Sequence, residues 1–326
     1  MYAYEAGRKA LEAALERRGI NGTVRMLDNL GTYKIDYACG DPSVAVVMTG
    51  YDAAQYRQLK ANTNYPSAKF IQVHDDDRLN DLISSIDTDY VMFVKRMKPL
   101  NPNWLREMVN YGTNAGIGAV GGKIFDSRQR VVNVGVTLRA LKSGRPFEMR
   151  GEWDEGIGYY FRDLLQRDIF AVTEDCMLVP RRDFLELGGF DNRLSPGLRG
   201  IDYCVRVREQ TGKTTLWQPY SRFEDYDHDH LALDAKDVAA YLKAHGTVTD
   251  PFAAACFPGD YGKQEGIIYA IDRVVPSRDG TKVKVTGWAA DLHGNDEVDI
   301  ALRRTRKASL HELHRVVRLD VNVSYP

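Results

Sequence analysis

Three short apolar runs early in the chain constrain its fold more than any other feature. They are residues 44–48 (VAVVM), 70–73 (FIQV) and 90–94 (YVMFV), and segments long enough to hold a helix separate them. A strand that is buried on both faces forms an almost continuous apolar run, and consecutive parallel strands need such a crossover. The pattern therefore predicts an α/β domain with a mostly parallel sheet.

Helices are predicted on both sides of these runs. Near the N-terminus, Leu11 and Leu15 share one helical face, and Gly19 follows where a left-handed C-terminal cap belongs. Two further helices are predicted over residues 104–111 and 181–187, and the second one ends at a pair of glycines.

The composition changes after about residue 250, and this change divides the chain. A segment rich in Gly, Ala, Pro and aromatic residues is followed by stretches that alternate or are β-branched, residues 267–275, 282–288, 298–304 and 314–321. We expect four parts: a helical lead-in (1–40), an α/β domain (41–252), a linker (253–265) and a small all-β module (266–326).

Composition excludes several classes of partner. The chain has 44 Lys and Arg against 45 Asp and Glu, so no overall basic field exists to hold nucleic acid. No apolar run reaches membrane-spanning length, and the first residues lack the apolar stretch of a secretory signal. The four cysteines form no CxxC pair, which favours reduced thiols and a cytoplasmic protein. Peripheral association with a membrane stays open.

Residues 116–121 (GIGAVG) match the glycine pattern of dinucleotide-binding loops. Such a loop needs a strand before the glycines and a helix after them. Here a predicted helix precedes the glycines and a predicted strand, residues 123–125, follows them. We therefore expect a tight turn at these glycines.

Acidic residues follow the second apolar run. Asp75 and Asp76 come directly after residues 70–73 and His74. The carboxyl ends of parallel strands are where open α/β sheets bind ligands, so these carboxylates could accept hydrogen bonds from a base and ribose or hold a hard divalent cation. The alternative is a solvated acidic turn.

A second ligand-capable stretch lies near residue 228. Asp227, His228 and His230 could bind one metal ion, because alternate residues of a strand share a face. A charged surface loop is the competing interpretation. Asp202 precedes an apolar and basic helical pattern, and taken alone it could be the N-terminal cap of that helix.

Residues 171–191 (AVTEDCMLVPRRDFLELGGFD) resemble a block of family 2 glycosyltransferases. Further stretches occur in the same order as in the rhamnosyltransferase-like members of that family: residues 4–15, 33–37 (YKIDY), 62–66 (NTNYP), 101–105 (NPNWL), 118–123 (GAVGGK) and 217–220 (WQPY). The resemblance covers about residues 4–252 and implies a GT-A fold, an α/β sheet that binds a nucleotide sugar with an acceptor half behind it. The β module is similar to accessory domains that follow some of these transferases.

The chain departs from the family at its chemical positions. The family's DxD-like motif, which holds Mn²⁺ or Mg²⁺ on the diphosphate, corresponds here to Lys95, Arg96 and Met97. Two cationic side chains cannot hold a cation, so the sequence assigns no cofactor with certainty, and Mn²⁺ or Mg²⁺ bound elsewhere stays an open alternative. The usual catalytic base corresponds to Gly200, which leaves Asp202 as the matching carboxylate.

Two interpretations follow from these departures. In the first, the chain transfers a sugar from a nucleotide-sugar donor to a glycan or polysaccharide acceptor without a metal, because Lys95 and Arg96 neutralise the diphosphate. In the second, the domain is catalytically inactive and serves as a scaffold or sugar-binding module, and further domains of a larger protein are an open alternative in either case. A metal-dependent hydrolase centred on the histidines lacks a recognisable nucleophile.

The transferase interpretation assigns a role to each candidate residue. Asp202 would take the proton of the acceptor hydroxyl, and Lys95 and Arg96 would bind the diphosphate. The residues expected to contact the nucleotide are Thr49, Asp52, Asp75 and Asp76.

Overall fold

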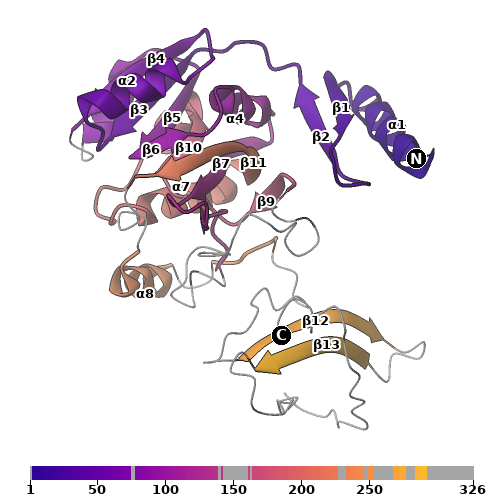
Figure 1. Ribbon diagram of the computed structural model, residues 1–326. Helices are drawn as coiled ribbons and strands as arrows, with labels where there is room; N and C mark the ends of the chain where they lie inside the picture. Colours follow the sequence, from indigo (N-terminus) through magenta and orange to yellow (C-terminus); the bar gives the residue numbers. More distant parts are fainter. Residues whose placement is uncertain are drawn as a thin grey trace. The chain divides into compact units, whose positions relative to one another are not determined.

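A computed structural model divides the chain into two compact units, Met1–Phe252 and Ala253–Pro326 (Figure 1). In the first unit the structure describes residues 2–74, 78–138, 141, 161, 164–226, 233–245 and 248–252; in the second it describes the backbone of residues 267–276 and 283–291. Each unit is considered by itself.

The described part of the first unit contains one nine-stranded mixed sheet. Its strand order is β4-β3-β5-β10-β7-β11-β6, with β8 paired to β7 and β9 paired to β11. The strands are β3 (Val44–Thr49), β4 (Ala68–Val73), β5 (Tyr90–Lys95), β6 (Met97–Pro99), β7 (Ile117–Phe125), β8 (Val131–Asn133), β9 (Arg167–Ile169), β10 (Cys176–Pro180) and β11 (Thr214–Asp225).

The three apolar runs form the parallel part of this sheet. Strand β3 is buried along its whole length and pairs in parallel with both β4 and β5. The predicted α/β class with its parallel strands is confirmed. Strand β10 then joins β5 in the antiparallel direction, with Cys176 opposite Val94. The residues just before β10 therefore lie at the edge where β3 and β5 end.

The predicted helices are also present. Helix α1 is followed by Gly19 at φ 64°, and α6 is followed by Gly188 and Gly189 at φ 77° and 71°. Both α4 and α7 pack on β7 and β11. The helices are α1 (Tyr2–Arg17), α2 (Ala53–Ala61), α3 (Leu79–Ser85), α4 (Trp104–Gly112), α6 (Arg181–Glu186), α7 (Leu198–Thr211) and α8 (Ala235–Ala244).

The tight turn predicted for residues 116–121 is wrong, because all but the first of these residues lie within strand β7. Valine side chains pack so closely against two of these glycines that no larger residue fits there. A Cβ on Gly118 would lie 2.3 Å from the Val207 side chain, and one on Gly121 would lie 2.5 Å from the Val172 side chain. Because a strand continues through the glycines, the strand–loop–helix geometry of a dinucleotide site does not form here.

In the second unit the first two predicted strands are confirmed as an antiparallel pair, β12 (Ile267–Pro276) and β13 (Val283–Asp291). The strands predicted over residues 298–304 and 314–321 lie outside the described residues. Among the described residues of the whole chain, no helix combines the length and apolar character that crossing a membrane requires.

Candidate functional site

Strands β3 and β5 end side by side, and this edge of the sheet holds three of the sequence-predicted residues. Thr49 pairs in register with Lys95, so the last residues of the two strands are neighbours. The Lys95 backbone N–H donates to the carbonyl of Asp175, 2.9 Å away, which brings the loop before β10 to the same edge. Open α/β sheets bind ligands outside the carboxyl ends of their parallel strands.

Arg96, the third of these residues, connects β5 to β6 in a left-handed backbone conformation, with φ 51°. Its N–H donates to the Thr49 carbonyl (3.2 Å), and its own carbonyl accepts from the N–H of Tyr226 (2.9 Å). Gly50 leaves space for its side chain, because a Cβ there would lie 2.7 Å from Arg96 Cγ. Few non-glycine residues have a positive φ, and those that do are concentrated at functional sites. Arg96 is thus fixed between the ends of β3 and β11.

Asp52 has a structural role as the N-cap of helix α2. Its Oδ1 accepts from the N–H groups of Ala54 and Gln55, both at 2.8 Å. The Gln55 side-chain oxygen accepts from the Asp52 N–H at 3.1 Å, which completes a capping box. The D-x-x-Q pattern could have identified this role from the sequence. Capping places Asp52 beside the loop that follows β3.

Two tyrosines that the sequence analysis did not single out line the same edge. The buried Tyr51 hydroxyl donates to the Met97 carbonyl (2.7 Å) and accepts from the Met97 N–H (2.8 Å). Tyr226 packs edge-on against Tyr51 at a centroid distance of 6.5 Å, and its hydroxyl donates to Gln58 of α2 (3.0 Å). Single aromatic residues carry no sequence signal that distinguishes this position from ordinary core packing.

Asp175 is a second residue that sequence reasoning missed. It is 1% exposed, and among the described residues neither of its carboxylate oxygens has a hydrogen-bond partner of normal geometry. Burial is the main cause that raises its pKa to about 7; the Glu174 carboxylate also raises the pKa, and Lys95 and the Thr173 hydroxyl lower it. The sequence signal that could have identified Asp175 is the pair of acids, Glu174 and Asp175, within the otherwise largely apolar residues 171–179.

Glu174 closes the position that corresponds to the family's base. Its carboxylate accepts from the N–H groups of Gly197 (2.6 Å) and Gly200 (3.0 Å) and pairs with Arg199 at 3.3 Å. A Cβ on Gly200 would lie 2.4 Å from the Glu174 backbone nitrogen. Position 200 therefore has no room for a side chain, and Glu174 caps the N-terminus of α7.

The structure does not place Asp202 at a helix N-cap, so that interpretation is wrong. Gly197 is the N-cap of α7, and Asp202 lies inside the helix, 5% exposed. Its Oδ2 accepts from Arg206 at 2.7 Å, and its Oδ1 accepts from the Tyr241 hydroxyl of α8 at 3.4 Å. The carboxylate is therefore already engaged by a cation and a hydroxyl.

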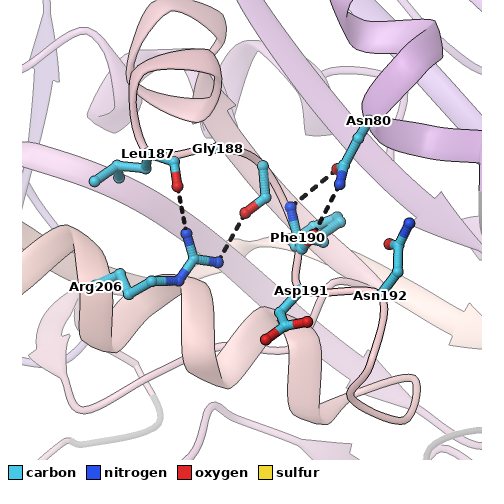
Figure 2. A pocket seen from close by; sticks show the side chains of 8 residues that line it. Asn80, Leu187, Gly188, Phe190, Asp191, Asn192 and Arg206 are labelled. Atoms are coloured by element: carbon cyan, nitrogen blue, oxygen red, sulfur yellow. Dashed lines mark hydrogen bonds between the residues drawn. The ribbon is translucent and has the colours of Figure 1, made fainter.

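Arg206 links Asp202 to an open cavity of about 370 Å³ (Figure 2). Its guanidinium donates to the carbonyls of Leu187 and Gly189, each at 2.7 Å. Asn80 of α3 holds the same loop by two hydrogen bonds to the Phe190 backbone, at 2.8 and 2.9 Å. The loop after α6 is thus tied to both α3 and α7.

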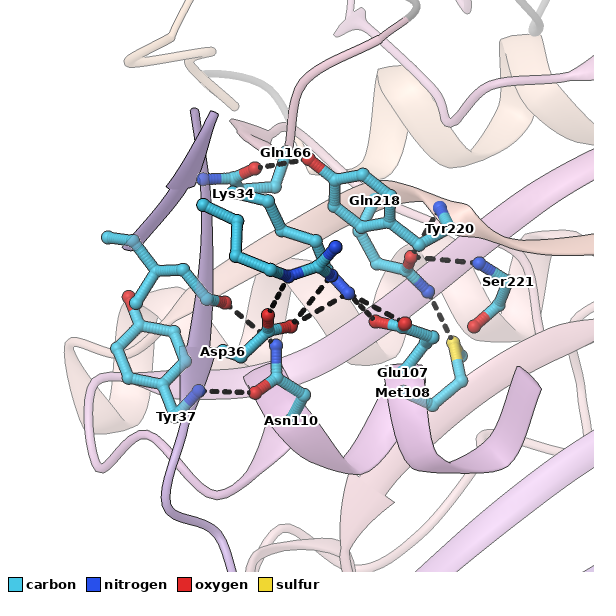
Figure 3. Close-up of polar contacts among 12 residues, drawn as sticks. Lys34, Asp36, Tyr37, Glu107, Met108, Asn110, Gln166, Gln218, Tyr220 and Ser221 are labelled. Carbon is cyan, nitrogen blue, oxygen red and sulfur yellow. Dashed lines mark hydrogen bonds and ion pairs between the residues drawn. The ribbon is translucent and has the colours of Figure 1, made fainter. Parts of the chain in front are cut away.

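A further polar network attaches the β1–β2 hairpin, β1 (Gly22–Met26) and β2 (Tyr33–Tyr37), to the sheet domain (Figure 3). The buried Lys34 ammonium contacts Glu107 of α4 at 2.5 Å and lies 4.6 Å from the ring centre of Tyr220 on β11. Asn110 bonds the hairpin backbone twice, at 2.6 and 3.0 Å. These contacts are structural.

The remaining sequence-predicted residues lie outside the described part of the chain: Asp75, Asp76, Asp227, His228 and His230. Among the described residues, no group of three His, Cys, Asp or Glu side chains could hold a metal ion. Lys95 and Arg96 at the edge of β5 are chemically unsuited to a divalent cation. The described residues therefore do not fit such an ion.

The chain was compared with family models, curated proteins and solved structures. No family model matches. The chain is 30% identical to the uncharacterized protein y4gI of Sinorhizobium fredii over 139 residues, 42% of this chain and 15% of the relative. It is 24% identical to the O-antigen biosynthesis protein RfbC of Myxococcus xanthus over 277 residues, 73% of this chain and 22% of that protein. The chain thus spans less than a quarter of either relative.

Solved structures similar to the chain include glycosyltransferases. GalNAc-T7 with UDP, GalNAc and Mn²⁺ has a TM-score of 0.43 at 11% identity, covering 68% of this chain and 51% of its own. The mannosyltransferase PcManGT of Pyrobaculum calidifontis with GDP-Man and Mn²⁺ has a TM-score of 0.40 at 11% identity, covering 65% and 66%. Mannosyl-3-phosphoglycerate synthase of Rubrobacter xylanophilus has a TM-score of 0.40 at 10% identity, covering 76% and 84%. The mixed α/β class of the chain follows from its own sheet topology.

Proposed function

We propose that residues 41–252 form a GT-A-type glycosyltransferase domain. It binds a nucleotide-sugar donor at the carboxyl edge of β3 and β5 and transfers the sugar to a glycan or growing polysaccharide. The observation that carries this proposal is the fixed position of Arg96, which stands beside Lys95 at the edge where a sheet of this class receives its ligand.

The donor's diphosphate would bind to Lys95 and Arg96. A nucleotide sugar carries two negative charges on its diphosphate, and a third develops as the sugar leaves. Fixed cations stabilise that developing charge, and a guanidinium offers two parallel donors to phosphate oxygens. Because Thr49 and Tyr226 hold the Arg96 backbone, ligand binding costs little conformational entropy of that backbone. Asp52 and Thr49, with Asp75 and Asp76, would contact the nucleotide.

Transfer without a divalent cation is part of the proposal. At the position of the family's metal-binding motif the chain presents positive charge, so the side chains themselves supply the neutralisation that an ion would supply elsewhere.

Asp202 is the proposed base for the acceptor hydroxyl, because it is the carboxylate that matches the family's motif. To act, it must exchange its bond with Arg206 for the acceptor's proton. That requirement supports a second candidate function, a domain that binds a sugar nucleotide or glycan without transferring anything. The closure of position 200 by Glu174 favours the same alternative.

The surrounding parts complete the proposal. The lead-in (1–40), the linker (253–265) and the β-rich module (266–326) would serve the transferase domain within a longer protein, at the cytoplasmic side and in peripheral contact with a membrane. The much greater length of both curated relatives supports further domains.

A transfer assay separates the two candidates. Release of nucleoside diphosphate from the bound nucleotide sugar would be followed with a glycan acceptor present, for wild type and for Asp202→Asn. The enzyme proposal predicts release that depends on the acceptor, and a fall of about 100-fold or more in the variant with donor affinity kept. A donor that binds without turnover would instead establish the non-transferring module, and unchanged turnover in the variant would exclude Asp202 as the base.

A further inference from the structure

One carboxyl group at the proposed donor edge has no part in the transfer chemistry above. Asp175 is fully buried, and among the described residues its two oxygens have no hydrogen-bond partner of normal geometry, although the Thr173 hydroxyl lies close enough to lower the pKa of the carboxyl. Buried polar groups in proteins are almost always hydrogen-bonded, since an unsolvated and unpaired charge costs several kcal/mol. Burial without strong partners disfavours the charged form, so this carboxyl group favours its protonated, neutral form.

The groups around Asp175 define its electrostatic environment. Lys95 of β5 is bonded to the Asp175 carbonyl through its backbone and lowers the pKa of the Asp175 carboxyl. Glu174, on the same loop, and Asp225, at the end of β11, both raise this pKa. Cys176 follows on β10, and burial raises the pKa of its thiol to about 12, so the thiol stays neutral. Among the described residues, Lys95 is thus a cation whose charge opposes the negative charge of Asp175.

We infer that Asp175 is the buried counter-ion of Lys95 and takes up a proton when a diphosphate binds, so that donor affinity falls as pH rises. This inference rests on the proposed donor site. In the free protein, the Lys95 ammonium partly offsets the charge that the Asp175 carboxylate carries above about pH 7. When the donor's diphosphate engages Lys95, the carboxylate is left with a second negative group nearby in a region of low dielectric. A proton from solvent on one Asp175 oxygen removes this repulsion, and no bond of the donor is made or broken.

The direction of the pH effect follows from linkage. Binding raises the proton affinity of Asp175, so the bound state holds more protons than the free state at pH values between the free pKa and the higher pKa of the bound state. That free pKa is about 7. The dissociation constant is therefore flat below about pH 6.5 and rises by up to about tenfold per pH unit above pH 7. Asp175 acts through Lys95 and is a positioning residue.

Calorimetric titration of the wild-type protein tests this directly. The probe is whichever of UDP-glucose, GDP-mannose and dTDP-rhamnose binds most tightly, because the diphosphate diester of a nucleotide sugar does not itself titrate near neutral pH. Titrations at about pH 7.5 in two buffers of different ionisation enthalpy give the number of protons taken up. We expect an uptake of up to about three-quarters of a proton and a dissociation constant that rises between about pH 7 and pH 8.5.

Variants assign the effect to Asp175. In Asp175→Asn, and in the smaller Asp175→Ser, proton uptake should vanish and the dissociation constant should stay near the wild-type low-pH value. The control is Asp183→Asn, which removes a buried carboxylate from α6, beside the opposite ends of β5 and β10, and should keep the wild-type pH profile.

Three outcomes would overturn the inference. Wild-type binding without proton uptake would contradict it directly, whether or not the variants fold. Uptake that persists in both Asp175 variants would assign the proton to another group. Failure of all three donors to bind at any pH would contradict the proposed donor site itself, and the inference with it.

Discussion

Gly50 and Arg96 fit together at the carboxyl edge of the sheet, because the space that a Gly50 side chain would occupy is filled by the stem of Arg96. A Cβ on Gly50 would lie 2.7 Å from Arg96 Cγ and 2.9 Å from Cδ. Both residues have a positive φ, 72° and 51°. The glycine after β3 therefore allows the cation after β5 to reach the end of its neighbour.

Gly50→Ala should displace Arg96 and weaken donor binding by about tenfold, with a loss of about 1 to 2 kcal/mol in the free energy of unfolding. The matched control is Gly40→Ala. Gly40 has φ 64° and no atom within 4 Å of a Cβ, so it carries the backbone strain without the contact. Calorimetric binding and thermal unfolding of both variants check the prediction. Equal donor affinities in the two variants would contradict the positioning role.

Lys95→Ala and Arg96→Ala should each weaken donor binding by about 10- to 100-fold, because charge-assisted hydrogen bonds contribute about 1.5–3 kcal/mol. Arg182→Ala is the control, since Arg182 is exposed on α6 and pairs with Glu186 four residues on. Binding is measured at two salt concentrations. If both site variants kept the wild-type donor affinity, the diphosphate would not bind at this edge of the sheet.

Asp175→Asn should change the pH dependence of stability. Burial raises the pKa of Asp175 to about 7, above an ordinary unfolded value of about 4. The stability associated with this group is therefore fully present below about pH 4 and is lost as pH rises through about 7. Relative to wild type, the melting temperature of the variant should rise by several degrees between pH 5 and pH 8.

Asp183→Asn is the stability control for that experiment. It breaks an ion pair with Lys213 at 2.6 Å and should lower the melting temperature at both pH values. If Asp175→Asn behaved in the same way, the Asp175 carboxylate would have to be compensated by partners, and its raised pKa would be contradicted.

Lys34→Ala should destabilise the protein by about 2–4 kcal/mol, because it leaves the Glu107 carboxylate without its buried partner. Arg25→Ala removes the exposed partner of Asp36 and should cost less than about 1 kcal/mol. Urea unfolding measures both. Donor binding by the folded variants should match wild type, and a loss of affinity in Lys34→Ala would show that the hairpin acts on the site.

The apolar runs predicted the parallel core because burial on both faces leaves a local mark in the sequence. They did not predict that β10 inserts antiparallel between β5 and β7, since the composition of a strand carries no direction. The turn predicted at residues 116–121 failed for a similar reason. Val172 and Val207, which require Gly121 and Gly118, are distant in the sequence.

The site residues likewise divide into those with a local sequence signal and those whose roles depend on distant contacts. Thr49 and Lys95 were predictable, because parallel strands bring their carboxyl ends together. Taken alone, Asp202 could have been the N-cap of its helix, but the Glu174 carboxylate from another loop caps that helix. The burial of Asp175 was not predicted, because it depends on the strands on either side of β10, which are distant in the sequence.

In the proposed donor site, side chains and not a metal ion hold the donor's diphosphate. The most direct test is calorimetric titration of the wild-type chain with UDP-, GDP- and dTDP-sugars in EDTA, repeated after adding excess Mn²⁺. We predict that at least one donor binds in EDTA with an affinity that Mn²⁺ leaves within about threefold. Binding only in the presence of Mn²⁺ would contradict the roles of Lys95 and Arg96, and no binding under either condition would contradict the donor site altogether.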